Sequence, residues 1–204
     1  MYNFTVSMAL MDYVPVIFFG VTAVLLLRDL YNKMSKGAYT MLAAGSVNVF
    51  TAGFSKATWK LLYAANICDF VALEELFMPV NSLGLLLVGI SLVLMVAAKK
   101  KTAALSVAPV PFVSSMPFIM MMVLGLGGMC TGLSIVSAKM KKAPVMILFI
   151  LSFVCAMGMG YMSSQDSTQS WVNWVEQSIN TVSQLCLMLG VIVLHKAGLK
   201  EASL

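Results

Sequence analysis

An apolar stretch at residues 102–138, held between two lysine clusters, constrains the fold of this chain more than any other feature. The clusters lie at 99–101 and 139–142, and the stretch has 37 residues, counting from 102 to 138 inclusive. One helical crossing of a bilayer needs about 20 apolar residues, and two crossings need about 40. The stretch is therefore long for one crossing and short for two, so the surrounding charges must decide between them.

The distribution of charge favours two crossings. If residues 102–138 cross once, the thirteen basic residues divide six to seven between the two sides. If the stretch enters and leaves from the same side, eleven basic residues lie on that side and only Lys56 and Lys60 on the other, together with six of the eight acidic residues. Membrane proteins gather lysine and arginine on the cytoplasmic side. We therefore predict a round trip, with the N-terminus outside and the C-terminus in the cytoplasm.

The rest of the chain is also rich in apolar runs. Its residues are 60% hydrophobic and only 10% charged, with a mean hydropathy of +0.93, which leaves too little polar surface to cover a soluble globule. The sequence predicts an all-α polytopic protein of the cell membrane with about seven transmembrane segments, of which the fourth, 102–116, is short or broken. The other expected spans lie near 13–27, 38–55 with a helical continuation to 63, 79–99, 117–138, 143–161 and 171–196.

A possible internal repeat divides the chain into two halves. Residues 1–101 would form the first three-helix half, 102–116 a linker segment and 117–204 the second half, all within one integral membrane domain. Small transporters use such parallel repeats, with the binding site between the halves. Chance similarity between apolar sequences is the alternative. Three pairs of identical residues stand 101 positions apart, namely Glu75 and Glu176, Ser82 and Ser183, and Gly89 and Gly190.

This arrangement is similar in outline to the sugar-transporting seven-helix family with proline-glutamine motifs. The similarity is one of topology, because Pro15 is followed by Val16 and Pro117 by Phe118.

Polar residues at helical spacing predict a pocket in the outer half of the membrane. Asn173, Gln177, Asn180 and Gln184 share one face of the last span. Amides facing lipid lack hydrogen-bond partners, so this face should point into the protein or into a water-filled cavity. The third span carries two polar lines, Glu74 with Asn81 and Glu75 with Ser82, and the two members of each line are seven positions apart. The second span carries two lysines beside a tryptophan. The predicted substrate-binding residues are Lys56, Trp59, Lys60, Glu75, Asn81, Ser82, Trp174, Glu176, Gln177, Asn180 and Gln184.

The same residues also have a purely structural interpretation. Lys56 and Lys60 could extend past the headgroups and pair with surface carboxylates. Trp174 would then anchor the last span at the membrane interface. Asn180 and Gln184 would only bridge neighbouring helices.

The favoured function is a transporter, or a membrane-embedded substrate-binding subunit, for a small polar or zwitterionic solute. Its partners would be that solute, anionic lipid headgroups at the lysine clusters and an energising or signalling protein, with no nucleic acid. The alternative is a sensor or accessory subunit. An enzyme acting on lipid headgroups through Glu75 or Glu176 is the third class. We expect no enzymatic activity, cofactor or metal, since His195 is the single histidine and the common catalytic motifs do not occur.

Overall fold

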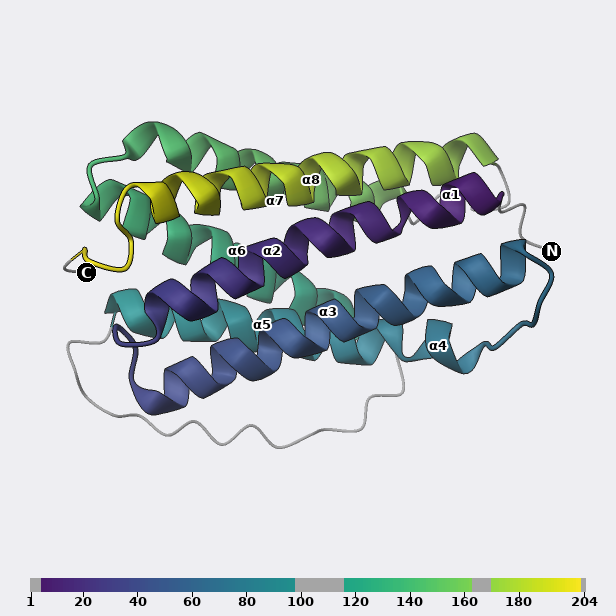
Figure 1. Cartoon of the computed structure of the whole chain (residues 1–204), viewed down its shortest axis with the longest axis horizontal. Helices are drawn as coiled ribbons and strands as arrows, with labels where there is room; N and C mark the ends of the chain where they lie inside the picture. The colour runs from purple at the N-terminus through teal and green to yellow at the C-terminus, as the bar shows by residue number, and fades with distance from the viewer. Residues whose placement is uncertain (1–4, 98–115, 163–169, 203–204) are drawn as a thin grey trace.

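The computed structural model describes residues 5–97, 116–162 and 170–202, and in these residues the chain is helical, without strands (Figure 1). The prediction of an all-α protein is confirmed. The elements are α1 (Val6–Met11), α2 (Tyr13–Leu30), α3 (Lys36–Ala64), α4 (Ala72–Glu75), α5 (Phe77–Ala97), α6 (Met116–Lys139), the 3-10 turn η1 (Ala143–Val145), α7 (Met146–Met162) and α8 (Ser170–Lys196).

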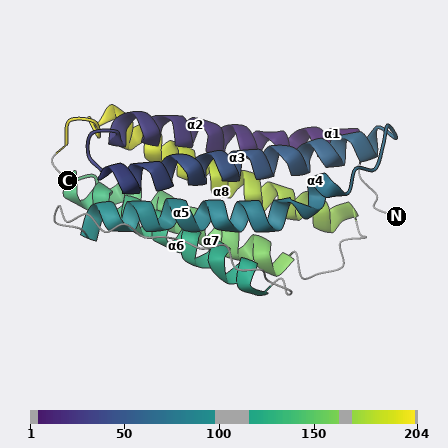
Figure 2. The ribbon, with the colours of Figure 1, turned by 90° about the horizontal axis from the view of Figure 1, so that it is seen from below.

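The long helices lie side by side along one axis and form an elongated bundle, as two perpendicular views show (Figures 1 and 2). Four helical stretches are long and apolar enough to cross a membrane, namely Val6–Leu30, Ala72–Ala97, Met116–Lys139 and Trp171–Lys196. The chain therefore has the features of a multi-pass membrane protein. Of the other two long helices, α3 contains three lysines and α7 has only 17 residues. The predicted count of seven spans is not supported.

The first helix begins earlier than the sequence predicts. Thr5 caps α1 by accepting a hydrogen bond from the backbone N–H of Met8, and only Asp12 separates α1 from α2. Pro15 explains this break, because proline has no N–H to donate to the carbonyl of Met11, four residues earlier. The break places Asp12 inside the bundle, where the residue is 7% exposed.

Helices α5 and α6 run in the same direction. A Cβ added to Gly125 would touch the backbone of Leu85, and one added to Gly132 would touch Leu92, so the contacts advance together along both helices. The C-terminal ends of α5 and α6 therefore lie at the same end of the bundle. Residues 102–115, which hold most of the predicted fourth segment, lie outside the described residues.

The helices pack as two groups of three. In the first group, which we call the glycine group, α5 packs against α3 and α6 at backbone distance. A Cβ on Gly45 would lie 2.6 Å from the carbonyl oxygen of Gly84, and a Cβ on Gly89 would lie 2.2 Å from that of Gly125. In the second, the α8 group, α8 packs against α2 and α7. Each group thus combines helices from before and after residues 98–115.

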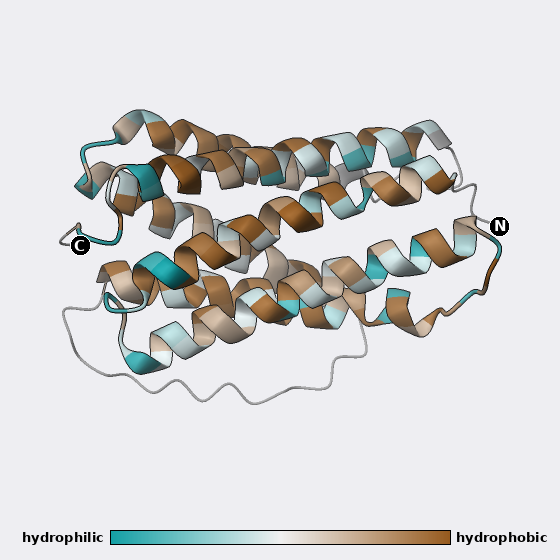
Figure 3. Cartoon of the chain, viewed as in Figure 1, coloured by the Kyte–Doolittle hydropathy of each residue, from teal (hydrophilic) through white to brown (hydrophobic). Residues whose placement is uncertain are grey.

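Hydrophobic residues gather between the two ends of the bundle (Figure 3), and the sequence gives the two ends different charges. At the lysine end, where α2, α5, α6 and α8 finish, lie most of the described basic residues. At the acidic end, where α3 finishes and α5 and α8 begin, Lys56 and Lys60 are the described basic residues. The lysine end carries Arg28, Lys33, Lys36, Lys139, Lys141, Lys142, Lys196 and Lys200, and the acidic end carries Asp12, Asp69, Glu74, Glu75 and Glu176.

The predicted repeat is not supported, because residues 101 positions apart have different surroundings. Gly89 approaches the backbone of another helix, whereas Gly190 faces only the ring of Phe149. Ser82 bonds back to its own helix, whereas Ser183 bonds to α7. The shared spacing therefore does not correspond to shared structural roles.

Candidate functional site

A cavity of about 430 Å³ lies between the two helix groups, towards the acidic end. This volume falls within the range of small-molecule sites, about 300–1,000 Å³. Both groups contribute to its walls, and they differ in character. The α8 group supplies Asp12, Pro15, Val16, Phe19, Ala156, Met157, Met159, Glu176, Gln177, Asn180 and Gln184. The glycine group, with Glu74 of α4, supplies Val49, Phe50, Gly53, Lys56, Ala57, Lys60, Phe77, Met78, Asn81, Leu85, Ile119, Met122, Val123 and Leu126.

Charges of both signs line this cavity. The ammonium of Lys60 lies 2.7 Å from Oδ2 of Asp12, and this ion pair joins α3 to the start of α2. The ammonium of Lys56 lies 4.2 Å from the centre of the Phe77 ring, a cation–π distance. The carboxylates of Glu176, Asp12 and Glu74 lie within electrostatic range of Lys56. In the part of the chain that the structure describes, Lys56 makes no ion pair within 4 Å.

Amide side chains continue the polar lining inwards. Gln177, Asn180 and Gln184 follow each other down the cavity face of α8, and Asn81 faces them from α5. From Gln177 to Gln184 is a depth of about 10 Å at 1.5 Å per residue. The side-chain oxygen of Gln184 is buried and has no hydrogen-bond partner among the described residues. The cavity can therefore offer amide donors and acceptors below the charges at its mouth.

Seven of the eleven predicted site residues line this cavity, and binding of a solute by them stays a prediction. Three of the four amides on the predicted polar face of α8 line the cavity, and Asn173 does not. The seven are Lys56, Lys60, Asn81, Glu176, Gln177, Asn180 and Gln184.

The other four predicted residues lie elsewhere. Trp59 is 2% exposed and donates from Nε1 to Asp69, at 2.9 Å. Ser82 donates to the carbonyl of Pro79, at 3.1 Å, within its own helix. Glu75 and Trp174 are exposed on the outside of the bundle. Trp59, Glu75 and Ser82 are chain neighbours of cavity residues, and one helical position turns a side chain by about 100°.

Sequence reasoning missed two acidic residues of the site. Glu74 lines the cavity instead of Glu75, so the structure selects the Glu74–Asn81 line of the third span and not the Glu75–Ser82 line. Asp12 lines the cavity as well, although the predicted first span begins at Tyr13 and leaves Asp12 outside it. The apolar run of α1, preceded by the capping residue Thr5, is the signal that could have placed Asp12 inside a helical segment.

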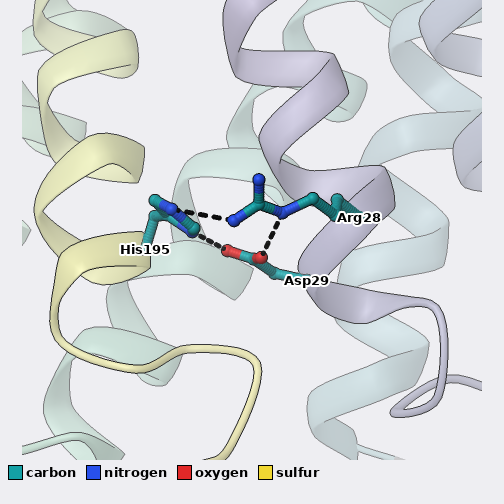
Figure 4. Close-up of polar contacts among 3 residues, drawn as sticks. All are labelled: Arg28, Asp29 and His195. Carbon is teal, nitrogen blue, oxygen red and sulfur yellow. Dashed lines mark hydrogen bonds and ion pairs between the residues drawn. The ribbon is translucent and has the colours of Figure 1, made fainter.

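At the lysine end, a second polar cluster joins α2 to α8 (Figure 4). Asp29 has a fully buried side chain, and its Oδ2 lies 2.7 Å from Nδ1 of His195. The guanidinium of Arg28 lies 3.0 Å from Nε2 of His195 and 3.5 Å from Oδ1 of Asp29. A neutral histidine that donates from Nδ1 and accepts at Nε2 satisfies both contacts.

An apolar layer separates the cavity from this polar cluster. The layer belongs to one continuous core cluster, and it draws residues from both helix groups. It includes Leu26 of α2, Leu42 of α3, Leu92 of α5, Val136 of α6, and Leu187 and Val191 of α8, each at most 2% exposed. The cavity is therefore sealed on its lysine side.

Comparison with known proteins assigns no family to this chain. No family model matches it, and neither a curated protein nor a solved structure matches it.

Proposed function

We propose that this protein is an integral membrane transporter, or the membrane-embedded substrate-binding subunit of one, for a small polar or zwitterionic solute. The observation that carries the proposal is the cavity between the two helix groups, which combines charges of both signs with amides in an otherwise apolar bundle. Buried charges and amides in membrane helices are costly, and they mark solute and ion pathways.

The cavity suits a ligand with two opposite charges. Lys56 offers an ammonium that makes no ion pair with the described residues, and Glu74 and Glu176 offer carboxylates from α4 and α8. A ligand carboxylate would bind at Lys56, and a ligand ammonium would bind at the glutamates. The amides below would bind the uncharged part of the solute by hydrogen bonds.

The charge difference between the two ends supports an orientation in the cell membrane. The lysine end would face the cytoplasm, where it would contact anionic lipid headgroups. The cavity would then open to the outside. A cytoplasmic energising or signalling partner would dock at the lysine end.

The proposal concerns binding and transport, not catalysis. It is tested with the purified chain, first by thermal unfolding in detergent with a panel of zwitterionic, cationic and anionic solutes of similar size. Solutes that raise the unfolding temperature are then offered, radiolabelled, to proteoliposomes. Uptake supports a transporter, and stabilisation without uptake supports the sensor or accessory subunit. If no solute stabilises the protein or enters the vesicles, the proposal is wrong.

A further inference from the structure

We propose that the two helix groups are rigid bodies and that the cavity changes its access from one end of the bundle to the other by movement of the α8 group against the glycine group. This inference rests on the proposed function, because it assigns a mechanism of access to the same cavity. Contacts within the two groups differ in kind from contacts across their boundary.

Contacts within the glycine group join backbone to backbone. The Cβ positions built on Gly45, Gly89 and Gly125 would lie 2.2 to 2.6 Å from main-chain atoms of the neighbouring helix. Helices that meet through their main chains cannot slide or tilt without steric overlap, since packed interiors deform little. The glycine group should therefore move as one unit.

The α8 group is held together by hydrogen bonds at two levels. In the middle, Ser183 donates to the carbonyl of Ser152, at 2.8 Å, and the two hydroxyl oxygens are 3.3 Å apart. At the lysine end, His195 joins α8 to Asp29 of α2 (Figure 4). Because these bonds are buried or partly buried, separating the helices would leave polar groups without partners, which is costly. The α8 group should also move as one unit.

Contacts across the boundary are made by side chains. Gly53 of α3 faces the side chain of Val16, and Gly20 of α2 faces the ring of Phe50, at 3.0 Å each from the built Cβ. Side chains can change rotamer as the groups move, whereas main chains cannot. The boundary is therefore the place where the bundle can rearrange at the lowest cost.

The charges at the mouth favour closure of the acidic end. Lys56 and Lys60 belong to the glycine group, and Asp12 and Glu176 belong to the α8 group, so opposite charges face each other across the boundary. The Lys60–Asp12 pair is already formed, at 2.7 Å, and it holds the two groups together at this end. Movement that narrows the mouth further would bring the ammonium of Lys56 closer to the carboxylates of the α8 group. The same movement separates the apolar layer at the lysine end, since both groups contribute residues to it.

Disulfide cross-linking tests this inference without any solute. The background variant replaces Cys68, Cys130, Cys155 and Cys186 by alanine and carries the reporter Val136→Cys in the apolar layer. The cross-boundary pair is Val16→Cys with Gly53→Cys. The built Cβ of Gly53 lies 3.9 Å from Cβ of Val16, within the range of about 3.5–4.5 Å found in disulfides. The matched control is Ser152→Cys with Ser183→Cys, which links α7 to α8 inside one group.

The readout is the rate at which a water-soluble maleimide labels the reporter in nanodiscs, and Lys141→Cys provides the fully exposed reference. We expect slow labelling in the reduced protein. Oxidation of the cross-boundary pair should slow the labelling about tenfold or more, and oxidation of the control pair should change it less than about twofold.

Two outcomes would overturn the inference. One is an equal labelling rate before and after oxidation of the cross-boundary pair. The other is a reporter that is never labelled in the reduced protein while the reference is labelled at once. Solute uptake is measured separately, so a failure here is distinguishable from a failure of the proposed function.

Discussion

Two buried carboxylates, Asp12 and Asp29, stand at opposite ends of α2, and their surroundings differ. Asp29 lies beneath the apolar layer with a fully buried side chain and pairs with a histidine and an arginine. Asp12 lies beside the cavity and pairs with Lys60. In both carboxylates the other oxygen, Oδ1, has no hydrogen-bond partner among the described residues. The carboxylate of Asp29 links α2 to α8 within the α8 group. The carboxylate of Asp12 joins the two groups at the edge of a cavity.

This difference shows that α2 can form a rigid contact with a neighbouring helix at one end and border a candidate binding cavity at the other. A charge enclosed by protein depends on its partners, because no water can replace them. A charge beside a cavity can exchange its partner for water or for a ligand.

Replacing His195 by alanine should destabilise the protein most. The fully buried carboxylate of Asp29 would lose its 2.7 Å partner, which should lower the free energy of unfolding by about 2–4 kcal/mol. The measurement is chemical unfolding in detergent. Lys196→Ala is the matched control, because Lys196 is the exposed neighbour on the same turn. Equal losses for the two variants would contradict the importance of the Asp29 contact.

Lys60→Met should have a smaller effect. It keeps the apolar stem of the lysine but removes the ammonium that binds Asp12. We expect a loss of about 1–2 kcal/mol, because water in the cavity can take part of the place of the lost partner. Combining Lys60→Met with Asp12→Asn should recover part of the loss in the same unfolding assay. The comparison between the two ends fails if Lys60→Met costs as much as His195→Ala.

Tyr13→Phe should weaken the boundary between the groups slightly. The hydroxyl of Tyr13 lies 3.0 Å from that of Thr58, and the Tyr13 ring packs edge-on against Phe54. Phenylalanine keeps the ring contact and loses one hydrogen bond, which should cost about 0.5–1 kcal/mol. A double-mutant cycle with Thr58→Val measures the coupling. A coupling near zero would show that the hydroxyls do not stabilise the boundary.

Lys56→Gln should leave stability almost unchanged and weaken solute binding. Lys56 makes no ion pair with the described residues, and the loss of its cation–π contact with Phe77 is offset by the removal of a poorly solvated charge, so the free energy of unfolding should change by less than about 0.5 kcal/mol. The affinity for a stabilising zwitterion should fall about tenfold, equivalent to about 1.4 kcal/mol. Thermal unfolding at increasing solute concentration gives both quantities. Lys56→Arg should retain binding, and equal affinities for all three proteins would remove Lys56 from the site.

The helical class and most helix positions could be predicted from the sequence, since long apolar runs bounded by charges have few other structures available in lipid. The continuation of the second span to Tyr63 was predicted, and α3 extends to Ala64. The count of seven spans and the repeat were not supported, because spacing along the chain carries no information about which helices become neighbours. The pairing of α5 with α6 depends on glycines that meet between two helices.

The cavity was predictable in composition but not in detail. The amides of α8 predicted which face of this helix points into the bundle, because four polar residues at helical spacing on an apolar helix define one direction. On α5 and its preceding turn, two polar lines were available, and only the packed bundle shows that Asn81 lines the cavity while Ser82 bonds within its helix. The rotation of a helix about its own axis is set by its neighbours, so it cannot be predicted from the sequence of that helix alone.

The polarity of α3 has a consequence for how the chain enters a membrane. This helix carries three lysines along its 29 residues and lies against α5 through Gly45 and Gly84. A segment of this composition partitions poorly into lipid by itself, but its apolar neighbours can shield it. We therefore expect α3 to insert into the lipid bilayer only after α5 has been synthesised. The two helices should insert together as a helical hairpin.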